Sequence, residues 1–587
     1  MSGGMLGAVL VANRGEIAVR LLRACKVRGI RAVAVYSEAD AGALHVRLAD
    51  EAYLLGPAPA RESYLNIDRI LDVAREARVD AIHPGYGLLS ENADFAARVV
   101  AAGLTFIGPE AQVIATMGDK VAARRAASGC GVPLLPGSAG VIEDPAEARR
   151  VAADIGFPLV VKACFGGGGR GMRVVREMDE LDAALEQAGR ESGAAFGRAE
   201  VYLERYVSHA RHVEVQILAD HHGTVLHLGD RDCSVQRRHQ KLIEEAPAPA
   251  LPDGLRADIL NAAVTLAQGV GYRSAGTVEF LVDPVGKRFY FLEMNTRLQV
   301  EHGVTELVTG IDLADWQLRI AAGEPLDFQQ ADIAVRGHAI QARIGAEDPW
   351  QGFRPDPGLV SRLRLPLGPW LRLDFGIESG DGIPGYYDAM FGKVQAFGHD
   401  RETARRHLVN ALADLEVEGV ATTAPYLRHV LEERAFIDVS HDTGSVERSW
   451  QPDPARCPPP SIPQTEDSEP AVKPLYERRV TVATSRGPLD IAIFGRDQGR
   501  RRNPTSDPGD AGASRKGEPL APMDASVGSV PVTVGQQVVA GDVLVVLEAM
   551  KMELQVSASR AGTVEQILVS PGDQTRRGTL LVRLSAS

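Results

Sequence analysis

Hydrophobic residues near the N-terminus alternate between two spacings. Residues 8–12 (AVLVA) form a short apolar run, residues 15–27 place apolar side chains three and four positions apart, and residues 31–36 (RAVAVY) are apolar again. Buried strands and an amphipathic helix have these patterns. They predict a βαβ opening, and therefore a parallel sheet covered by helices, because parallel neighbours need a crossover connection. Similar alternation continues to about residue 115.

The pattern then changes. Residues 116–330 contain longer apolar strands that are joined by glycine-containing turns and interrupted by helices, which predicts an α+β domain. Residues 331–448 are mixed again, with helical stretches at 403–415 and 424–433. Residues 518–587 consist of short apolar alternations between glycine-containing turns, which predicts a small all-β sandwich or flattened barrel.

Residues 449–517 differ in composition from both of their neighbours. The stretches 451–470 and 496–517 lack hydrophobic periodicity and cannot bury enough apolar surface to fold alone. Between them, RRVTVATS and LDIAIFG predict two short strands with a turn at Arg486–Pro488. The predicted organisation is three domains, a linker with a short β unit at 478–495, and a terminal domain: 1–115, 116–330, 331–448, 449–517 and 518–587.

Composition narrows the class of protein. A chain of 587 residues is too long to fold around one hydrophobic core. Its content of 45% hydrophobic and 24% charged residues is ordinary for a globular protein. A net charge of −13 argues against nucleic acid as a partner, and the linker arginines 500–502 lack interleaved aromatics, which favours a solvated charge cluster. The five cysteines form no CxxC pair. No apolar run is long enough for a membrane span or a signal sequence, so a cytoplasmic protein without membrane association is predicted.

A lysine motif stands near the C-terminus. Lys551 lies in LEAMKMELQV, at a tight turn between two predicted strands. Such a lysine is usually a solubilising charge, but the flanking Met550 and Met552 suit a recognition surface better. The segment resembles the biotinyl domain of biotin-dependent carboxylases, in which this lysine carries biotin through an amide bond. That family usually has Pro-Gly where Asp524 and Ala525 stand, so a rebuilt turn is expected there.

A glycine loop follows a predicted strand in PLVVKACFGGGGRGMRVV. Neither a P-loop nor a GxGxxG motif after the first strand is present. Here the strand ends at Lys162, and Gly166–Gly169 lead toward a second strand. Successive glycines allow backbone N–H groups to close over phosphates. A surface hairpin without a ligand explains the glycines alone equally well.

Two predicted strands within 277–302 carry acidic side chains. With a period of two, Glu293, Asn295 and Arg297 project from one face of the second strand. Glu279 lies on the first strand, paired across the intervening turn. Carboxylate and amide oxygens suit Mg²⁺ or Mn²⁺. A salt-bridged sheet face is the structural alternative, and the neighbouring glycine hairpin favours the metal site.

Residues 5–445 together resemble the ATP-grasp fold and, more narrowly, the biotin carboxylase domain. The resemblance rests on many motifs, among them VANRGEIAVR (11–20), HPGYGLLSEN (83–92), RDCSVQRRHQK (231–241) and EMNTRLQVEH (293–302). It implies an α/β and α+β architecture: an N-terminal βαβ domain, a central ATP-grasp domain, a mixed C-terminal domain, a linker and a biotinyl sandwich. The activity it implies is ATP- and bicarbonate-dependent carboxylation of biotin on Lys551.

The resemblance also implies roles for individual residues. Glu301 would accept the bicarbonate proton, with Arg297 and Lys241 holding the bicarbonate charge and Arg343 stabilising the ureido oxygen of biotin. The remaining expected contacts are with ATP phosphates (Lys120, Lys162, Gly168 and Gly169), adenine (Glu204, Arg205, Tyr206 and Val207), ribose and phosphates (His212, Gln236 and His239), metal (Glu279, Glu293 and Asn295) and bicarbonate (Gln299 and Val300, beside Lys241, Arg297 and Glu301).

Four positions near this machinery depart from the family pattern. Gly303 stands where the family usually has proline, which is expected to loosen the backbone after Glu301. Phe165 replaces a small residue beside the glycine loop, and Gln341 and Gly345 flank Arg343 where relatives tend to have Glu and Asn. No assigned chemical group is missing, so activity is expected.

The resemblance extends to partners. The chain has no room for a carboxyltransferase domain, so a separate carboxyltransferase β subunit is implied, as in bacterial acyl-CoA carboxylases, with acetyl- or propionyl-CoA as the leading substrates. Biotin protein ligase would attach the biotin, and a homo-oligomer would form through the biotin carboxylase domain. The region 449–516 is much shorter than the subunit-docking domain of longer homologues, and we interpret the 478–495 unit as a remnant of that domain or a substitute for it. Two alternatives stay open: an ATP-grasp ligase for another carboxylate with a lipoyl-type carrier, and a degenerate, non-catalytic carrier scaffold.

Overall fold

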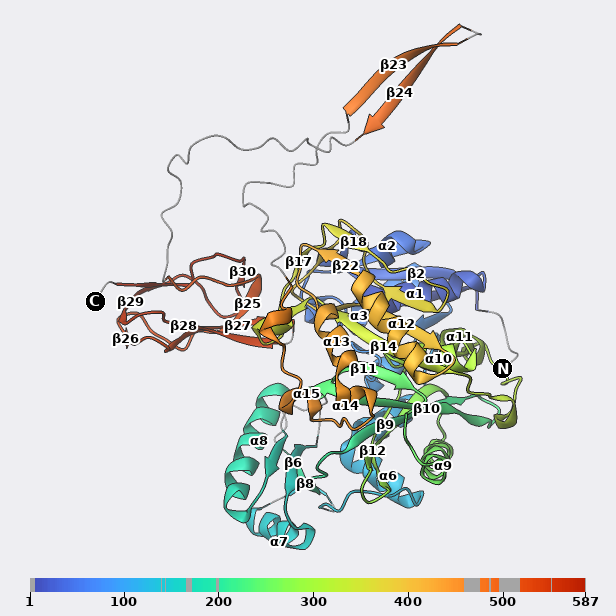
Figure 1. Cartoon of the computed structure of the whole chain (residues 1–587), viewed down its shortest axis with the longest axis vertical. Coiled ribbons are helices and arrows are strands. Elements are labelled where there is room, and N and C mark those ends of the chain that lie inside the picture. The colour runs from blue at the N-terminus through green and yellow to red at the C-terminus, as the bar shows by residue number, and fades with distance from the viewer. Residues whose placement is uncertain are drawn as a thin grey trace. The chain divides into compact units, whose positions relative to one another are not determined.

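The computed structural model describes most of the chain in two compact units: one contains residues up to 458 together with Ala549–Met552, and the other contains the remaining later residues (Figure 1). Side chains are not described at 163, at 194–196 or in the two strands between 476 and 495. The described residues are 6–138, 140–142, 144–164, 172–196, 200–458, 476–484, 487–495, 518–550 and 552–585.

The first domain contains a five-stranded parallel sheet in the order β3-β2-β1-β4-β5. Apolar clusters lie on both of its faces, which is why the strands read as continuous apolar runs. The predicted βαβ opening is confirmed, and the predicted helix at 15–27 has the same bounds in the structure. The elements are β1 (Ala8–Val11), α1 (Gly15–Val27), β2 (Arg31–Ser37), α2 (Leu44–Leu48), β3 (Glu51–Gly56), α3 (Ile67–Glu76), β4 (Ala81–His83), α4 (Ala93–Ala101) and β5 (Thr105–Phe106).

A small three-stranded sheet, β7-β6-β8, follows and is covered by two helices (Figure 1). Ala148, Ala152 and Leu181 of these helices pack against Val161 and Leu203 of the sheet. The elements of this region are α5 (Ala111–Gly118), α6 (Lys120–Gly129), α7 (Pro145–Ile155), β6 (Leu159–Ala163), β7 (Arg173–Val175), α8 (Leu181–Phe196) and β8 (Val201–Arg205).

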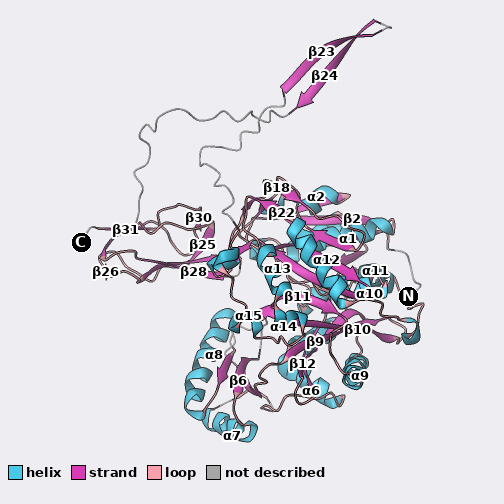
Figure 2. Cartoon of the chain, viewed as in Figure 1, coloured by secondary structure: helices cyan, strands magenta, loops and turns pink. Residues whose placement is uncertain are grey.

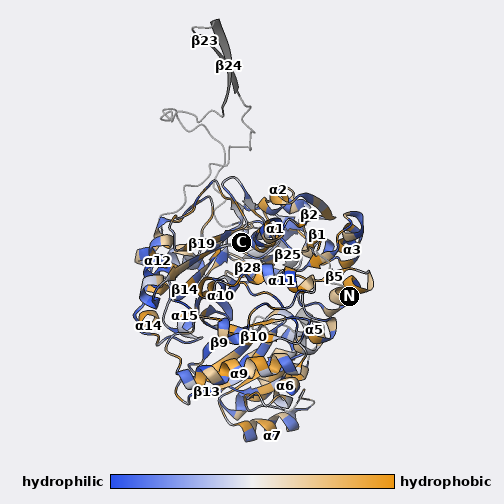
Figure 3. Cartoon of the chain, turned by 90° about the vertical axis from the view of Figure 1, so that its right-hand side faces the viewer, coloured by the Kyte–Doolittle hydropathy of each residue, from blue (hydrophilic) through white to orange (hydrophobic). Residues whose placement is uncertain are grey.

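An eight-stranded antiparallel sheet forms the centre of the unit, in the order β13-β12-β9-β10-β11-β14-β21-β19. It continues across the predicted boundary at residue 330, so the second and third predicted domains share one sheet. The helix α9 mixes hydrophobic and polar residues (Figure 3) and buries Ile259, Ala263 and Leu266. Its elements and helices are β9 (Arg211–Ala219), β10 (Val225–Arg237), β11 (Gln240–Ala246), α9 (Asp253–Gly269), β12 (Ser274–Asp283), β13 (Arg288–Asn295), α10 (His302–Thr309), α11 (Leu313–Ala321), β14 (His338–Gly345), β19 (Leu371–Phe375) and β21 (Met390–Gly398).

The rest of this unit consists of short strands and of helices that pack against β10, β14 and β21 of the large sheet (Figure 2). The predicted helices at 403–415 and 424–433 are present as α12 and α13, with ends within two residues of the prediction. These elements are β15 (Glu347–Asp348), β16 (Arg354–Pro355), β17 (Gly358–Leu359), β18 (Arg362–Arg364), β20 (Gly382–Ile383), α12 (Arg401–Asp414), β22 (Glu416–Glu418), α13 (Ala424–Glu432), α14 (Arg434–Ile437) and α15 (Ser445–Arg448).

The later residues form a two-stranded hairpin and an all-β domain. The hairpin strands start two residues before each predicted strand, and Gly487 and Pro488 belong to the second strand instead of the predicted turn. In the terminal domain, Asp524 Oδ1 accepts the backbone N–H of Arg577 at 2.8 Å, which fixes the departing turn. The predicted sandwich is confirmed as two sheets, β28-β27-β25-β30 and β26-β29-β31. The strands are β23 (Tyr476–Thr484), β24 (Gly487–Gly495), β25 (Ala525–Ser529), β26 (Gln537–Val538), β27 (Val543–Ala549), β28 (Met552–Ser557), β29 (Gly562–Ile567), β30 (Gln574–Thr575) and β31 (Val582–Leu584).

Within the described residues, no helix has the length and hydropathy to cross a membrane.

Candidate active site

Lys241 on β11 lies at the centre of a buried cluster of charges. Its Nζ donates to one oxygen of each of three carboxylates: Glu214 at 2.6 Å, Glu279 at 2.8 Å and Glu301 at 2.7 Å. The first two face the same point because Glu279 on β12 is the register partner of Glu214 on β9. Burial by itself would lower the pKa of Lys241, but the three carboxylates raise it well above its ordinary value. The ammonium therefore stays charged.

Glu301 stands at the N-cap of α10 and is fully buried. One of its oxygens accepts from Lys241, and the other accepts from Arg343 at 2.9 Å. Burial by itself would raise the pKa of Glu301, but Lys241, Arg343 and Arg231 together hold that pKa well below its usual value. Glu301 is therefore an ionised carboxylate, which is the form that can accept a proton.

Arg343 on β14 connects Glu301 to a second buried carboxylate. Its Nε donates to Glu244 Oε1 at 2.5 Å. Gln341, one of the departures, donates its amide to the other oxygen of Glu244 at 3.0 Å. A glutamate at 341 would place a second carboxylate against Glu244, so the glutamine removes a like-charge contact behind Arg343.

Glu279 and Glu293 are register partners across β12 and β13, as the turn between these strands predicted. Asn295 donates its amide to Glu279 at 2.8 Å. Burial would raise the pKa of Glu279, but Lys241 and His212 lower it. Burial and the charge of Glu279 raise the pKa of Glu293. Two carboxylates on paired strands are a donor set that fits a divalent cation.

The strict alternation predicted for β13 is wrong in one respect. The pairing shifts between Glu279 and Phe280, so that Leu292 is an extra, bulged residue and both Phe291 and Met294 reach the hydrophobic core. The strand also ends at Asn295, before Arg297.

Arg297 nevertheless reaches the same cluster from the loop after β13. It donates to Asn295 Oδ1 at 3.2 Å, to Gln299 Oε1 at 3.0 Å and to Glu91 Oε2 at 2.9 Å. Gln299 in turn donates to Glu279 at 3.3 Å. Arg297 therefore reaches this cluster because its side chain is long, and not from the strand position that the sequence suggested.

A second group of predicted residues gathers around Glu204 on β8. Lys162 on β6 donates to Glu204 Oε2 at 2.6 Å, and Arg124 contacts the other oxygen. Lys120 begins α6 after the N-cap Asp119, and burial lowers its pKa although Glu293 acts in the opposite direction. Lys120 and Lys162 both belong to the predicted domain 116–330, which also contains the glycine loop.

His212 is another predicted residue beside the carboxylate cluster, with its Nε2 at 3.0 Å from Glu279 Oε2. Gln236 and His239 lie at the end of β10 and on the turn that follows it, while Arg205 and Tyr206 are exposed and Val207 is half-buried. Gly168, Gly169, Phe165 and Lys551 lie outside the described residues. The roles proposed for all these residues stay predictions.

Gly303 has a packing role that the sequence did not indicate. Gly303 lies in the first turn of α10, and a Cβ at this position would come 1.8 Å from Gln395 Oε1 on β21. The glycine therefore permits a close approach between the helix and the sheet. Gly345 similarly gives room to Glu347, whose Oε2 would lie 2.9 Å from an added Cβ.

Sequence reasoning missed three charged members of the site: Glu214, Arg231 and Glu244. All are fully buried. Arg231 donates to Glu214 at 2.5 Å. The signal for Glu214 was present in RHVEVQ, where polar residues alternate with valines, because such an alternation puts His212 and Glu214 on the same face of a strand.

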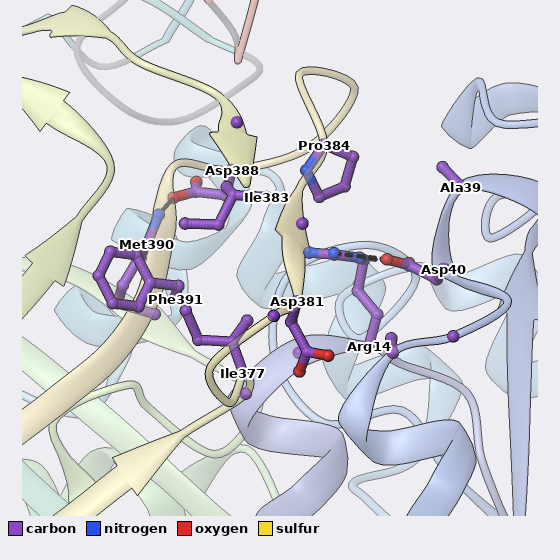
Figure 4. A pocket seen from close by; sticks show the side chains of 17 residues that line it. Arg14, Ala39, Asp40, Ile377, Asp381, Ile383, Pro384, Asp388, Met390 and Phe391 are labelled. Carbon is purple, nitrogen blue, oxygen red and sulfur yellow. Dashed lines mark hydrogen bonds and ion pairs between the residues drawn. The ribbon is translucent and has the colours of Figure 1, made fainter. Parts of the chain in front are cut away.

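A cavity of about 310 Å³ lies apart from these carboxylates, between the first domain and the end of the large sheet (Figure 4). Arg14 and Asp40, which are paired at 2.7 Å, both line it. Gly376 and Ile377, which follow β19, form part of its wall.

Comparison with known proteins places this site in a family. Models of four domains match the chain: the biotin carboxylase N-terminal domain at 5–114, the carbamoyl-phosphate synthase L chain ATP-binding domain at 119–329, the biotin carboxylase C-terminal domain at 341–448 and the biotin-requiring enzyme domain at 520–584. The biotin carboxylase of Haemophilus influenzae is 51% identical over 433 residues, which cover 74% of this chain and 96% of that protein. The chain belongs to the biotin carboxylase family.

Other biotin carboxylase relatives extend the match. The biotin-dependent acyl-coenzyme A carboxylase alpha3 subunit of Mycobacterium leprae is 44% identical and aligns over 99% of this chain and 98% of its own length. Its similarity therefore includes the carrier domain and the region before it. ATP, Mg²⁺ and biotin, the cofactors expected from the sequence, are those of the matched domains and structures.

Solved biotin carboxylases share the fold of the first unit. A complex of the Campylobacter jejuni enzyme with an ATP analogue has a TM-score of 0.74 at 43% identity and covers 76% of this chain and 99% of its own. The biotin carboxylase domain dimer of Hydrogenobacter thermophilus 2-oxoglutarate carboxylase, with MgADP, ADP and bicarbonate, has a TM-score of 0.73 at 46% identity and covers 76% and 98%. The predicted fold class is confirmed.

Proposed function

We propose that this chain uses ATP and bicarbonate to carboxylate a biotin carried on its own Lys551. One observation carries the proposal: Glu301 is held ionised between Lys241 and Arg343, beside the paired carboxylates Glu279 and Glu293. A general base, two fixed cations and a metal-binding pair are the groups that this reaction needs. The biotin-requiring domain at the end of the same chain provides the acceptor.

The first step is attack by a bicarbonate oxygen on the γ-phosphorus of ATP, which forms carboxyphosphate and releases ADP. Glu301 takes the proton that bicarbonate loses. Lys241 and Arg297 offset the negative charge of bicarbonate. Glu279 and Glu293 would hold Mg²⁺, which would supply charge neutralisation for the triphosphate, and Lys120 and Lys162 would add positive charge beside the phosphates.

The second step transfers the carboxyl group to biotin. Carboxyphosphate breaks down to CO₂ and phosphate, and that phosphate accepts the proton of the biotin ring N–H. Arg343 then stabilises the negative charge that develops on the ureido oxygen. The nitrogen attacks CO₂, so carboxybiotin and phosphate are the products.

Carboxybiotin is passed to a separate carboxyltransferase β subunit, which carboxylates an acyl-CoA. Full-length similarity to the alpha3 subunit of Mycobacterium leprae supports this assignment. Acetyl-CoA and propionyl-CoA are the substrates proposed. A biotin protein ligase modifies Lys551, and the biotin carboxylase region forms a dimer, as the Hydrogenobacter thermophilus domain does.

Phosphate release from ATP tests the proposal directly. We expect ATP cleavage by the purified chain to depend on bicarbonate and to be stimulated by free biotin. Cleavage that ignores both, or that requires a different carboxylate, would contradict it. Co-purification with the native partner and assay against a panel of acyl-CoA thioesters would then identify the substrate.

A further inference from the structure

Lys393 on β21 is a fully buried cation that none of the proposed steps uses. Its Nζ donates to the backbone carbonyl of Val300 at 2.9 Å and lies 3.0 Å from Glu16 Oε1. Asp374 on β19 is farther away, at 3.8 Å. Burying an ammonium group costs several kcal/mol unless it is paired, so these contacts explain how the charge is tolerated. They join three parts of the unit: the loop before α10, the start of α1, and β19.

The register of the large sheet places Lys393 beside the site. Lys393 is the direct partner of Arg343 on β14 and of Asp374 on β19. Direct partners in a sheet project from the same face. Arg343 binds the carboxylate of Glu301, and Lys393 binds the carbonyl of the peptide that joins Val300 to Glu301. The two cations therefore hold Glu301 in two ways: Arg343 binds its side chain, and Lys393 binds the peptide group that precedes it.

Neighbouring polar groups direct Lys393 to the Val300 carbonyl. Gln395 donates its amide to Asp374 Oδ2 at 2.8 Å, and Arg372 donates to the same oxygen at 3.0 Å. With this oxygen already taken by two donors, the short contacts of Lys393 go to Val300 and Glu16 instead.

Glu16 is itself fixed from two sides. The hydroxyl of Tyr86 donates to the carboxylate oxygen that faces Lys393. The end of β19 packs directly on the start of α1, since a Cβ on Gly376 would lie 2.4 Å from the backbone nitrogen of Glu16. Gly376 and Arg14 both line the cavity of Figure 4.

We propose that Lys393 is a positioning residue for biotin carboxylation. By holding the Val300–Glu301 peptide, with Glu16 as its counter-ion, it keeps the carboxylate of Glu301 where bicarbonate must deliver its proton. The inference rests on the proposed function. It concerns the bicarbonate end of the site, because the consecutive residues Gln299, Val300 and Glu301 are all proposed to bind bicarbonate. The lysines proposed for ATP, Lys120 and Lys162, lie on α6 and β6.

Lys393→Met tests the role, together with the double variant Lys393→Met/Glu16→Gln, which leaves no unpaired buried charge. In both we expect kcat for bicarbonate-dependent ATP cleavage to fall by roughly 10- to 100-fold, because a displacement of about 1 Å has an effect of this size. The KM for bicarbonate should rise about fivefold or more. The KM for ATP should stay within about twofold of wild type, because the affected loop does not carry the ATP residues.

Arg401→Met provides the matched control. Arg401 pairs with buried Glu245 on the same sheet, at 2.6 Å, without contacting the site. It should lower the melting temperature and leave the KM for bicarbonate unchanged. The inference is overturned if the double variant folds and keeps the wild-type KM for bicarbonate and kcat, or if its kinetic losses only follow its content of folded protein, as in the control. A wild-type chain without bicarbonate-dependent cleavage would instead refute the proposed function.

Discussion

Lys241 and Glu301 form a buried ion pair with 2.7 Å between Nζ and Oε1. The lysine is shared with two further carboxylates, whereas Glu301 is shared with Arg343. Charges of both signs thus compensate one another in a largely buried cluster, and the two groups remain ionised there. The proposed base and the cation that would hold its substrate are therefore prearranged in contact.

Replacing the base tests its role. Glu301→Gln keeps the shape of the side chain but cannot accept a proton, so we expect bicarbonate-dependent ATP cleavage to fall by about 10²- to 10⁴-fold. Phosphate release at saturating ATP measures the change. Glu110→Gln, at an exposed carboxylate paired with Arg273, should leave the rate at the wild-type level. A Glu301→Gln enzyme with wild-type turnover would show that the proton goes elsewhere.

The carboxylate pair leads to a prediction about the metal. Glu293→Gln removes one of the two charges opposite Mg²⁺, so a higher Mg²⁺ concentration should be needed for half-maximal ATP cleavage, on the order of tenfold. A Mg²⁺ titration at fixed ATP reports it. Asp283→Asn, at the turn of the same hairpin, is the control and should not shift the curve. An unchanged requirement in Glu293→Gln would remove this residue from the metal site.

The contact between Gly303 and Gln395 predicts coupling. Gly303→Ala forces a methyl group against Gln395 Oε1 and should destabilise the protein by roughly 1–3 kcal/mol. Gln395→Ala in the same chain makes room for that methyl group, so the double variant should be more stable than the sum of the single changes implies. Melting temperatures of the four proteins in this cycle provide the measurement. Additive effects would mean that the helix relaxes away from the sheet.

His83 predicts a dependence of stability on pH. Burial lowers its pKa from 6.5 to about 3. Between these values the unfolded chain binds a proton that the folded chain does not, so the contribution of neutral His83 is complete above the unfolded pKa and is lost as pH falls toward 3. By about pH 5 the loss should reach roughly 2 kcal/mol.

His83→Gln separates this effect from the titration of carboxylates. The glutamine can still accept the backbone N–H of Gly85, as His83 Nδ1 does at 3.0 Å. We expect its melting temperature to fall less steeply than that of wild type between neutral pH and about pH 5. Parallel curves for the two proteins would assign the acid sensitivity to other groups.

The sequence by itself determined the local elements and the family. The periods of its apolar residues placed α1 and the first two strands, and the turn between 277 and 302 was enough to pair Glu279 with Glu293. Its motifs indicated ATP, biotin and Mg²⁺, because the family motifs that imply these cofactors are short, continuous segments.

Tertiary structure decided how these segments share charge. The choice of neighbouring strands in the large sheet determines the bulge at Leu292, the contacts of Arg297 and the grouping of three carboxylates around Lys241. Periodicity is a local property, whereas hydrogen bonds such as that of Lys393 to Val300 join residues whose distance in space is set only by packing. The sequence therefore predicted the type of reaction, whereas the arrangement of the charged side chains depends on how the strands pack together.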